Sequence, residues 1–305
     1  MTLLPYSVVI ATLDRPDDLR RALRSLRAQA HPPAEVVVAD ASEGDASRLV
    51  CASSLAPGFR VRHLRCAVKS AAQQRNDGAA LATTPLIAFM DDDAAADPDC
   101  LAELAEPFAD GEVAGVSGRM RGSTHSPPRG LLRLYYRLQA GYPHPHYGAK
   151  LIGPAISCFP CYEDGTDDLI AADWLNTGCV LYRADAFRKA GGFPRFQGYS
   201  PFEDVYLSAA IARRGGKLYF HRAAYYDHYP KLDRPKQDRR RHGAMHMRNR
   251  ELTCRGALGM AGASLYLRLF LHRLFVSAAI LRGAGSAGEK LDEILGTWQA
   301  NKLAN

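Results

Sequence analysis

The segment PLIAFMDDDAAADPDCLAELAEPF, residues 85–108, decides the fold. Its apolar first part predicts a strand buried on both faces, as in a parallel sheet. Three carboxylates, Asp91, Asp92 and Asp93, follow the strand directly. Pro98 then stands at the first turn of a predicted helix, where proline is favoured. The segment therefore predicts a buried strand, an acidic turn and a helix.

The chain before this segment repeats the same alternation of strand and helix. Apolar or alternating runs predict strands at residues 6–12, 35–40 and 59–65. Helical spacing of apolar residues predicts helices at residues 15–29 and 70–82. Repeated strand–helix units predict an α/β fold with a doubly wound, mostly parallel sheet and right-handed crossovers.

The later part of the chain is less regular and then becomes helical. Residues 121–173 are rich in Pro, Gly, His and Tyr, so we expect an irregular stretch there. A strand-like run at 173–183 and a helix at 184–192 follow. Residues 202–216 predict a strong amphipathic helix with a glycine C-terminus. From residue 231 the chain is basic and then helical.

The acidic triplet is a candidate metal site. In open α/β sheets, ligands bind outside the carboxyl ends of the strands, where Asp91, Asp92 and Asp93 stand. Adjacent carboxylates repel one another, so a cation or solvent must stabilise them, and removing one should stabilise the metal-free protein. Hard oxygen ligands suit Mg²⁺ or Mn²⁺ bound to substrate phosphates. The alternative is an acidic turn that caps the next helix.

Five segments, in order, resemble the motifs of family 2 glycosyltransferases, which have the GT-A fold. FMDDDAAADPDCL resembles the DxD segment of that family. The other four are VVIATLDRPDDLRRALRSL, EVVVADASEGDASR, QQRNDGAALATTPLIAFMDDD and NTGCVLYRADAFRKAGGF with PFEDVYLSAAIARRGGKLYF. The resemblance covers about residues 5–230. It implies a catalytic domain at 1–230, with a nucleotide-binding half at 1–120 and an acceptor-side half at 121–230, and a helical C-terminal extension at 231–305.

The resemblance implies residues for a nucleotide-diphospho-sugar donor and for a Mn²⁺ or Mg²⁺ ion. The implied metal ligands are Asp93, Asp91 and His228. The implied donor-binding residues are Thr12, Asp14, Arg15, Asp40, Arg75, Asn76, Asp91 and Asp92. Outside the resemblance, Arg248 and Arg250 are candidates for a diphosphate clamp, because a guanidinium matches phosphate in a bidentate fashion. The triplet permits a one-residue shift, so the roles of its members stay open. Turn chemistry, helix caps and solvated helix faces are the alternatives for these residues.

The same resemblance implies an acceptor side. Asp204 is the candidate general base, and Glu203 holds the acceptor or orients the loop. Both stand at the start of a predicted helix, whose dipole favours their ionised forms. Trp174 and Tyr199 are candidates for stacking on an acceptor sugar. Ordinary roles as helix N-terminal residues and as core aromatics are the alternatives.

Charge and cysteine content bear on compartment and partners. The net charge is +7, and residues 228–255 carry nine Lys and Arg against three Asp and Glu. This basic region suits phosphate or anionic lipid, but it has few interleaved aromatics, so no nucleic-acid partner is expected. Cys158 and Cys161 form the one CxxC, with no second pair at zinc-ribbon spacing. We therefore expect reduced thiols and a cytoplasmic location.

The segment SLYLRLFLHRLFVSAAILRG, residues 264–283, is apolar but interrupted. Arg268, His272 and Arg273 lie in its middle, which disfavours a membrane-spanning helix. No basic and apolar signal segment is expected at the N-terminus. The segment is predicted to pack on the catalytic domain, to form a homodimer contact, or to lie in the headgroup layer on the inner face of a membrane.

The residues and the resemblance together predict an enzyme of the hexosyltransferase type. We expect a metal-dependent, inverting transfer from a nucleotide sugar, with UDP favoured, to a glycan or lipid-linked acceptor in cell-surface polysaccharide synthesis. A nucleotidyltransferase on a related sheet is one alternative, but the first loop, TLDRPDD, lacks the Gly-rich basic sequence usual there. The other alternative is a non-catalytic homologue that binds nucleotide sugars.

Overall fold

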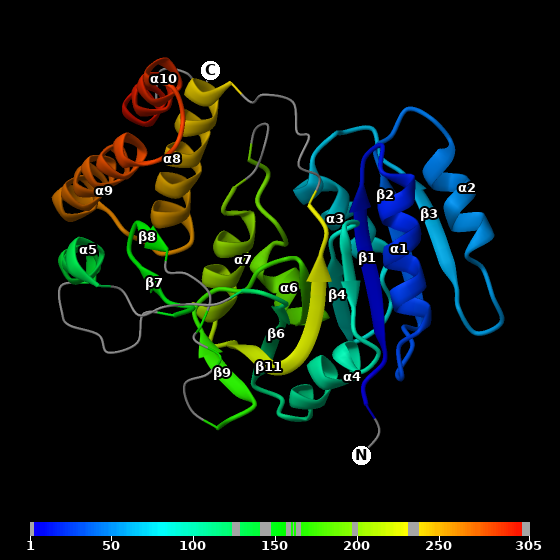
Figure 1. Cartoon of the computed structure of the whole chain (residues 1–305). Helices are drawn as coiled ribbons and strands as arrows, with labels where there is room; N and C mark the ends of the chain where they lie inside the picture. Colours follow the sequence, from blue (N-terminus) through cyan, green and yellow to red (C-terminus); the bar gives the residue numbers. More distant parts are fainter. Residues whose placement is uncertain are drawn as a thin grey trace.

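The computed structural model contains one mixed sheet of nine strands within the described residues, flanked by helices (Figure 1). The described residues are 3–123, 129–140, 148–156, 160, 162, 166–196, 201–230 and 238–300. Two predicted features, Tyr199 and the pair Cys158 and Cys161, lie outside them. The strand order is β3-β2-β1-β4-β10-β6-β11-β5, and β9 pairs with β11.

Four parallel strands form the first half of the sheet, as the sequence predicts. They are β1 (Tyr6–Thr12), β2 (Glu35–Asp40), β3 (Val61–Arg65) and β4 (Leu86–Met90). The helices between them are α1 (Pro16–Arg27), α2 (Ala46–Ser53) and α3 (Ala71–Leu81). Because these strands run in parallel, their carboxyl ends meet at one edge of the sheet, where the acidic triplet follows β4.

The second half of the sheet is mixed. Its strands are β5 (Ala94–Ala96), β6 (Val113–Met120), β9 (Leu169–Ala172), β10 (Cys179–Arg183) and β11 (Lys217–His228). Strand β10 runs antiparallel between β4 and β6, and β11 is parallel to β6 but antiparallel to β5 and β9. The accompanying helices are α4 (Cys100–Ala105), the 3₁₀ turn η1 (Glu106–Ala109), α6 (Ala184–Ala190) and α7 (Glu203–Ala212). The doubly wound α/β fold is confirmed, with a mixed second half.

Alternating side chains of the strands make two cores, one on each face. Val8 and Ile10 of β1 pack with α1, α2 and α4, whereas Val9 packs with α3, α6 and α7. Gly78 lets α3 approach the sheet, because a Cβ at this position would lie 2.5 Å from Cγ1 of Val9. The close approach fixes α3, whose N-terminal half carries site residues.

Two expectations were wrong. The helix over 202–216 is not amphipathic: in α7, Val205 and residues 207–211 are buried, because the helix contacts the sheet, α6 and α8. The stretch 121–173 is also not irregular throughout. It contains α5 (Gly130–Ala140) and a hairpin of β7 (Leu151–Ile152) and β8 (Ala155–Ile156).

The predicted helical C-terminal extension is confirmed. It consists of α8 (Arg239–Gly256), α9 (Gly262–Arg282) and α10 (Ala287–Trp298), which stand together beside α7 in Figure 1. Their own small core contains Met247, Cys254, Leu265, Leu269 and Ala300. Among the described residues, α9 is the one helix long and apolar enough to cross a membrane. The predicted boundary between the catalytic domain and the C-terminal extension, at residue 230, lies between β11 and α8. It stays a prediction.

Candidate active site

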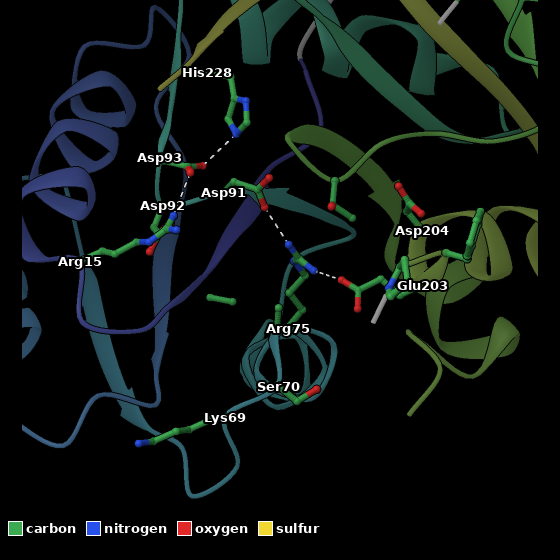
Figure 2. A pocket seen from close by; sticks show the side chains of 15 residues that line it. Arg15, Lys69, Ser70, Arg75, Asp91, Asp92, Asp93, Glu203, Asp204 and His228 are labelled. Carbon is green, nitrogen blue, oxygen red and sulfur yellow. Dashed lines mark hydrogen bonds and ion pairs between the residues drawn. The ribbon is translucent and has the colours of Figure 1, made fainter. Parts of the chain in front are cut away.

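A cavity of about 650 Å³ opens at the carboxyl ends of β1 and β4. The N-termini of α3 and α7 and the last residue of β11 complete its wall. Eight of the predicted site residues line it: Arg15, Arg75, Asp91, Asp92, Asp93, Glu203, Asp204 and His228 (Figure 2). The fold therefore brings the acidic triplet and the acceptor-side acids into one cavity, although they are more than a hundred residues apart in the sequence.

The three carboxylates of the triplet have different surroundings. Asp92 is buried, and it accepts hydrogen bonds from the Thr12 hydroxyl at 2.7 Å and from Arg15 at 3.2 Å. Burial raises the pKa of Asp92 to about 6, against the opposing effects of Thr12 and Arg15. Thr12 and Asp92 thus hold β1 against the end of β4, and their predicted donor roles stay predictions. Asp91 and Asp93 also line the cavity, where they pair with Arg75 and Arg15, respectively.

Asp91, Asp93 and His228 form a cluster. Their candidate ligand atoms all lie within 4.8 Å of one another. The pairing of β5 with β11 explains this, because it aligns His228 with Ala94, and Tyr229 N–H donates to the carbonyl of Asp93 at 2.8 Å. Nε2 of His228 lies 3.2 Å from Oδ1 of Asp93. The local strand register therefore brings an imidazole to the predicted DxD carboxylates.

The chemistry of this cluster fits a divalent cation. Burial raises the pKa of Asp93, but His228 and Arg15 outweigh it and hold that pKa below its usual range. Arg15 donates to Oδ2 of Asp93 at 2.8 Å. Asp93 is therefore ionised at neutral pH. Two carboxylates and one imidazole are ligands that suit Mn²⁺ and also accept Mg²⁺.

Arg75 connects the two sides of the cavity. It is 6% exposed, it donates to Oδ1 of Asp91 at 2.7 Å, and it also pairs with Oε1 of Glu203 (Figure 2). The guanidinium carbon of Arg75 also lies over the ring of Phe193, 5.6 Å from the ring centroid. In the structure, the positive charge of Arg75 compensates two carboxylates. Its predicted position near the nucleotide stays a prediction.

Helix α7 begins with Glu203 and Asp204, and both residues line the cavity. They follow Phe202, whose φ of 77° is left-handed, so the chain turns sharply before the helix. Burial raises the pKa of Glu203 to about 7, with Arg75 lowering it and Asp204 raising it. Burial also raises the pKa of Asp204 to about 6, against the hydrogen bond from the N–H of Val205. These values suit proton transfer near neutral pH.

Three predicted donor residues are not part of the cavity lining. Asp40 is fully buried and bonds to Ser42 and, at 2.9 Å, to His63. The amide of Asn76 donates to and accepts from the backbone of Phe193. Asp14 is in the left-handed region, and its N–H donates to Ser42. Their donor roles stay predictions.

Three other predicted residues lie outside the lining of this cavity. Trp174 is buried, with its ring edge-on to Phe220 at 5.9 Å. This contact favours core packing, and the predicted acceptor role of Trp174 stays a prediction. Arg250 bonds to the carbonyl of Pro154 and covers the ring of Phe202, rather than reaching the cavity. Arg248 is half-buried on α8 and does not line the cavity.

The cavity also has residues that the sequence analysis missed. Lys69, Ser70 and Thr177 line it. Ser70 is the N-cap of α3, where its hydroxyl accepts from the N–H of Gln73. A Lys-Ser pair at the start of the predicted helix was the available signal, because helix N-termini and basic side chains bind phosphates. Thr177 precedes β10 and had no such signal.

The fold is similar to that of glycosyltransferases with the GT-A fold. Residues 7–152, slightly under half of the chain, match the model of glycosyl transferase family 2. The resemblance to family 2 is thereby confirmed. Comparison with curated proteins finds no significant match.

Solved structures of glycosyltransferases share the fold over nearly the whole chain. A mannosyltransferase from Pyrobaculum calidifontis, in complex with GDP-Man and Mn²⁺, is 14% identical, with a TM-score of 0.60 over 99% of this chain and 88% of that one. GalNAc-T7, with UDP, GalNAc and Mn²⁺, is 16% identical, with a TM-score of 0.63 over 96% and 54%. S. aureus TarS 1-349, with UDP-GlcNAc, is 15% identical, with a TM-score of 0.58 over 99% and 82%.

The family match and these neighbours support a glycosyltransferase that uses a nucleotide sugar. The cluster of Asp91, Asp93 and His228 supports a divalent metal.

Proposed function

We propose that this protein is an inverting, metal-dependent hexosyltransferase. It moves a sugar from a nucleotide-diphospho-sugar to a hydroxyl of a glycan or lipid-linked acceptor, in the synthesis of a cell-surface polysaccharide. One observation carries the proposal: the cluster of Asp91, Asp93 and His228 shares its cavity with Glu203 and Asp204. A cation site and a carboxylate of raised pKa are the two parts that such a transfer requires.

Asp91, Asp93 and His228 would hold Mn²⁺ or Mg²⁺. When bound, the ion supplies positive charge to the diphosphate of the donor. Arg15 lies at 2.8 Å from Asp93, and Lys69 lines the same cavity, so both add to the positive potential there. Oriented charges in a confined cavity stabilise a departing diphosphate more strongly than they would in water.

Asp204 is the proposed general base. An acceptor hydroxyl attacks the anomeric carbon, its proton passes to the Asp204 carboxylate, and the bond from that carbon to the phosphate oxygen breaks. The nucleoside diphosphate departs with the electron pair. A single displacement of this kind inverts the anomeric configuration and needs one base, unlike the paired carboxylates of glycoside hydrolases. Because the pKa of Asp204 is raised only to about 6, the group is mainly ionised at pH 7 yet basic enough to act.

The donor base and the acceptor follow from likeness rather than from contacts. UDP is favoured, since two of the similar structures contain UDP or a UDP-sugar, and GDP is the next candidate, since another contains GDP-Man. A lipid-linked acceptor would bring the protein to the inner face of a membrane from the cytoplasm.

The proposal is tested by the product of donor cleavage. The full chain is incubated with UDP-, GDP- and dTDP-sugars and Mn²⁺, without acceptor, and the products are identified by mass spectrometry. We expect slow release of a nucleoside diphosphate and a free sugar with one of the donors, and no release after Asp93→Ala. Release of a nucleoside monophosphate or of pyrophosphate would instead indicate nucleotidyl transfer. A parallel incubation includes candidate acceptors, and tight donor binding without cleavage there would indicate a non-catalytic homologue.

A further inference from the structure

Helices α5 and α9 pack against each other, although about 130 residues separate them in the sequence. The ring of Tyr135 stacks on Phe275, with centroids 4.0 Å apart, and its hydroxyl bonds to Nδ1 of His272. The amide of Gln139 donates to the carbonyl of Arg268 at 2.9 Å. The two helices therefore form one layer at the edge of the C-terminal helices.

Helix α9 has an apolar side that nothing covers within the described residues. Its inner side is attached to the protein through Leu265, Leu269 and His272, which are buried. Leu267, Leu274 and Leu281 recur every seven residues, so they lie along the opposite side of the helix. Their side chains are 46% to 62% exposed.

Helix α5 has a similar side. Leu131, Leu134 and Leu138 recur at helical spacing, and they are 51% to 60% exposed. Tyr135, the residue that holds α5 to α9, is buried. We use the term α5–α9 surface for the exposed apolar side chains of Leu131, Leu134, Leu138, Leu267, Phe270, Leu274 and Leu281. An exposed apolar set of this size marks an interaction site more often than ordinary surface.

The charged side chains of these two helices have one sign. Helices α5 and α9 contain five arginines and no Asp or Glu. Arg133 and Arg137 on α5 and Arg282 at the end of α9 are exposed, as is Arg129 just before α5. Exposed leucines interspersed with arginines and free of carboxylates complement an anionic lipid surface, which offers acyl chains and phosphates together.

The other occupants fit less well. A second copy of the chain in a two-fold dimer would repeat the same surface on both sides, so arginines would face arginines with no carboxylate between them. A helix that crosses the bilayer is also disfavoured, because α9 is hydrogen-bonded to the neighbouring helices of the protein. Arg273 bonds to the carbonyl of Thr297 on α10, and Arg268 bonds to the carbonyl of Gln139 on α5.

We propose that the α5–α9 surface docks the protein on an anionic membrane, with α9 lying in the headgroup layer. Helix α8, which shares a core with α9, also holds the turn before the candidate base. Asn249 donates to the carbonyl of Pro201 at 3.2 Å, and Arg250 lies over Phe202 at 4.4 Å. If the acceptor is lipid-linked, as in the proposed function, docking brings it toward Glu203 and Asp204. Docking on the membrane does not itself depend on the proposed function.

The test is co-sedimentation of the full chain with vesicles of phosphatidylcholine, alone or mixed with phosphatidylglycerol, at low and high salt. We expect sedimentation that increases with phosphatidylglycerol and weakens at high salt. L267E/L274E should reduce the bound-to-free ratio about tenfold or more, because two apolar side chains no longer enter the lipid. R133E/R137E should lower binding to anionic vesicles and leave the weak binding to phosphatidylcholine unchanged.

L49E/L55E is the matched control, since these leucines are 62% and 57% exposed but lie on and after α2. It should sediment like the wild type, and circular dichroism should show that all variants are folded. Absence of sedimentation at low salt would overturn the proposal, as would equal loss in the control. Binding that L267E/L274E leaves intact would also overturn it. A dimer in ultracentrifugation that L267E/L274E dissolves, without vesicle binding, would assign the surface to a second copy. No donor is present, so failure here leaves the proposed transfer reaction untouched.

Discussion

Nη2 of Arg75 lies 2.7 Å from Oδ1 of Asp91, in a position where the arginine is almost completely buried. The other arm of the same guanidinium pairs with Glu203 at the start of α7. One buried cation on α3 thus joins a candidate metal ligand to the acceptor side. The charge of Arg75 compensates two carboxylates that would otherwise repel each other in a buried site.

Replacing Arg75 with Met should destabilise the protein strongly. The change removes the cation and leaves Glu203 buried without its partner, so we expect a loss of about 3 to 5 kcal/mol in the free energy of unfolding. Chemical denaturation measures it. The double variant Arg75→Met with Glu203→Met should lose less than the sum of the two single losses. Additive losses would show that the pair is not coupled.

Replacing Asp204 with Asn should remove the general base and spare donor binding. The transfer rate should fall by about 10²- to 10⁴-fold, while the affinity for the nucleoside diphosphate stays near that of the wild type. Glu203→Gln serves as the comparison, since it removes the neighbouring charge and keeps Asp204. A variant Asp204→Asn that transfers sugar at the wild-type rate would exclude Asp204 as the base.

The transfer rate should depend on pH with an acidic limb. Burial raises the pKa of Asp204 to about 6, and only the ionised carboxylate accepts a proton. At saturating donor and metal, kcat should therefore fall as pH decreases through this value, approaching about tenfold per pH unit. Nucleoside diphosphate binding, measured at each pH, controls for loss of the metal site. A flat profile through this range, with binding intact, would contradict the assignment.

Gly78→Ala should destabilise the nucleotide half. The added Cβ would lie 2.5 Å from Cγ1 of Val9, so α3 must move from the sheet at a cost of about 1 to 3 kcal/mol. Gly288 is the matched helical control, because no atom lies within 4 Å of its Cβ position. Gly288→Ala should not lower the melting temperature. Equal melting temperatures for the two variants would show that the close approach of α3 is not required.

The first half of the fold was predictable because its signals are local. Buried parallel strands are continuous apolar runs, and helix starts carry proline, acids or serine, as at Pro16 and Ser70. The second half was harder, because β10 is an antiparallel strand between β4 and β6, and no local signal specifies that pairing. Helix α7 was misjudged for the same reason: its burial comes from the sheet, α6 and α8.

The site was predictable as a set of residues but not as a network. Sequence reasoning treated Asp91, Asp92 and Asp93 as mutually repelling, so removal of one was expected to stabilise the metal-free protein. The structure brings Arg15, Arg75 and His228 to these carboxylates. The pKa of Asp93 is held low, so its charge stabilises the fold above its usual titration range, and the stabilisation is lost as pH falls through the lowered pKa. Asp93→Ala should now destabilise the metal-free protein, by about 1 to 3 kcal/mol.

The most direct test of the central claim is calorimetry of nucleoside diphosphate binding with and without Mn²⁺. The wild type should bind one of UDP, GDP and dTDP tightly only when Mn²⁺ is present, and Asp93→Ala should lose that dependence together with the affinity. His228→Ala should weaken Mn²⁺-dependent binding to a smaller extent, since two carboxylates remain. Unchanged Mn²⁺-dependent affinity in Asp93→Ala would contradict the account of Asp91, Asp93 and His228 as the metal centre of a glycosyltransferase.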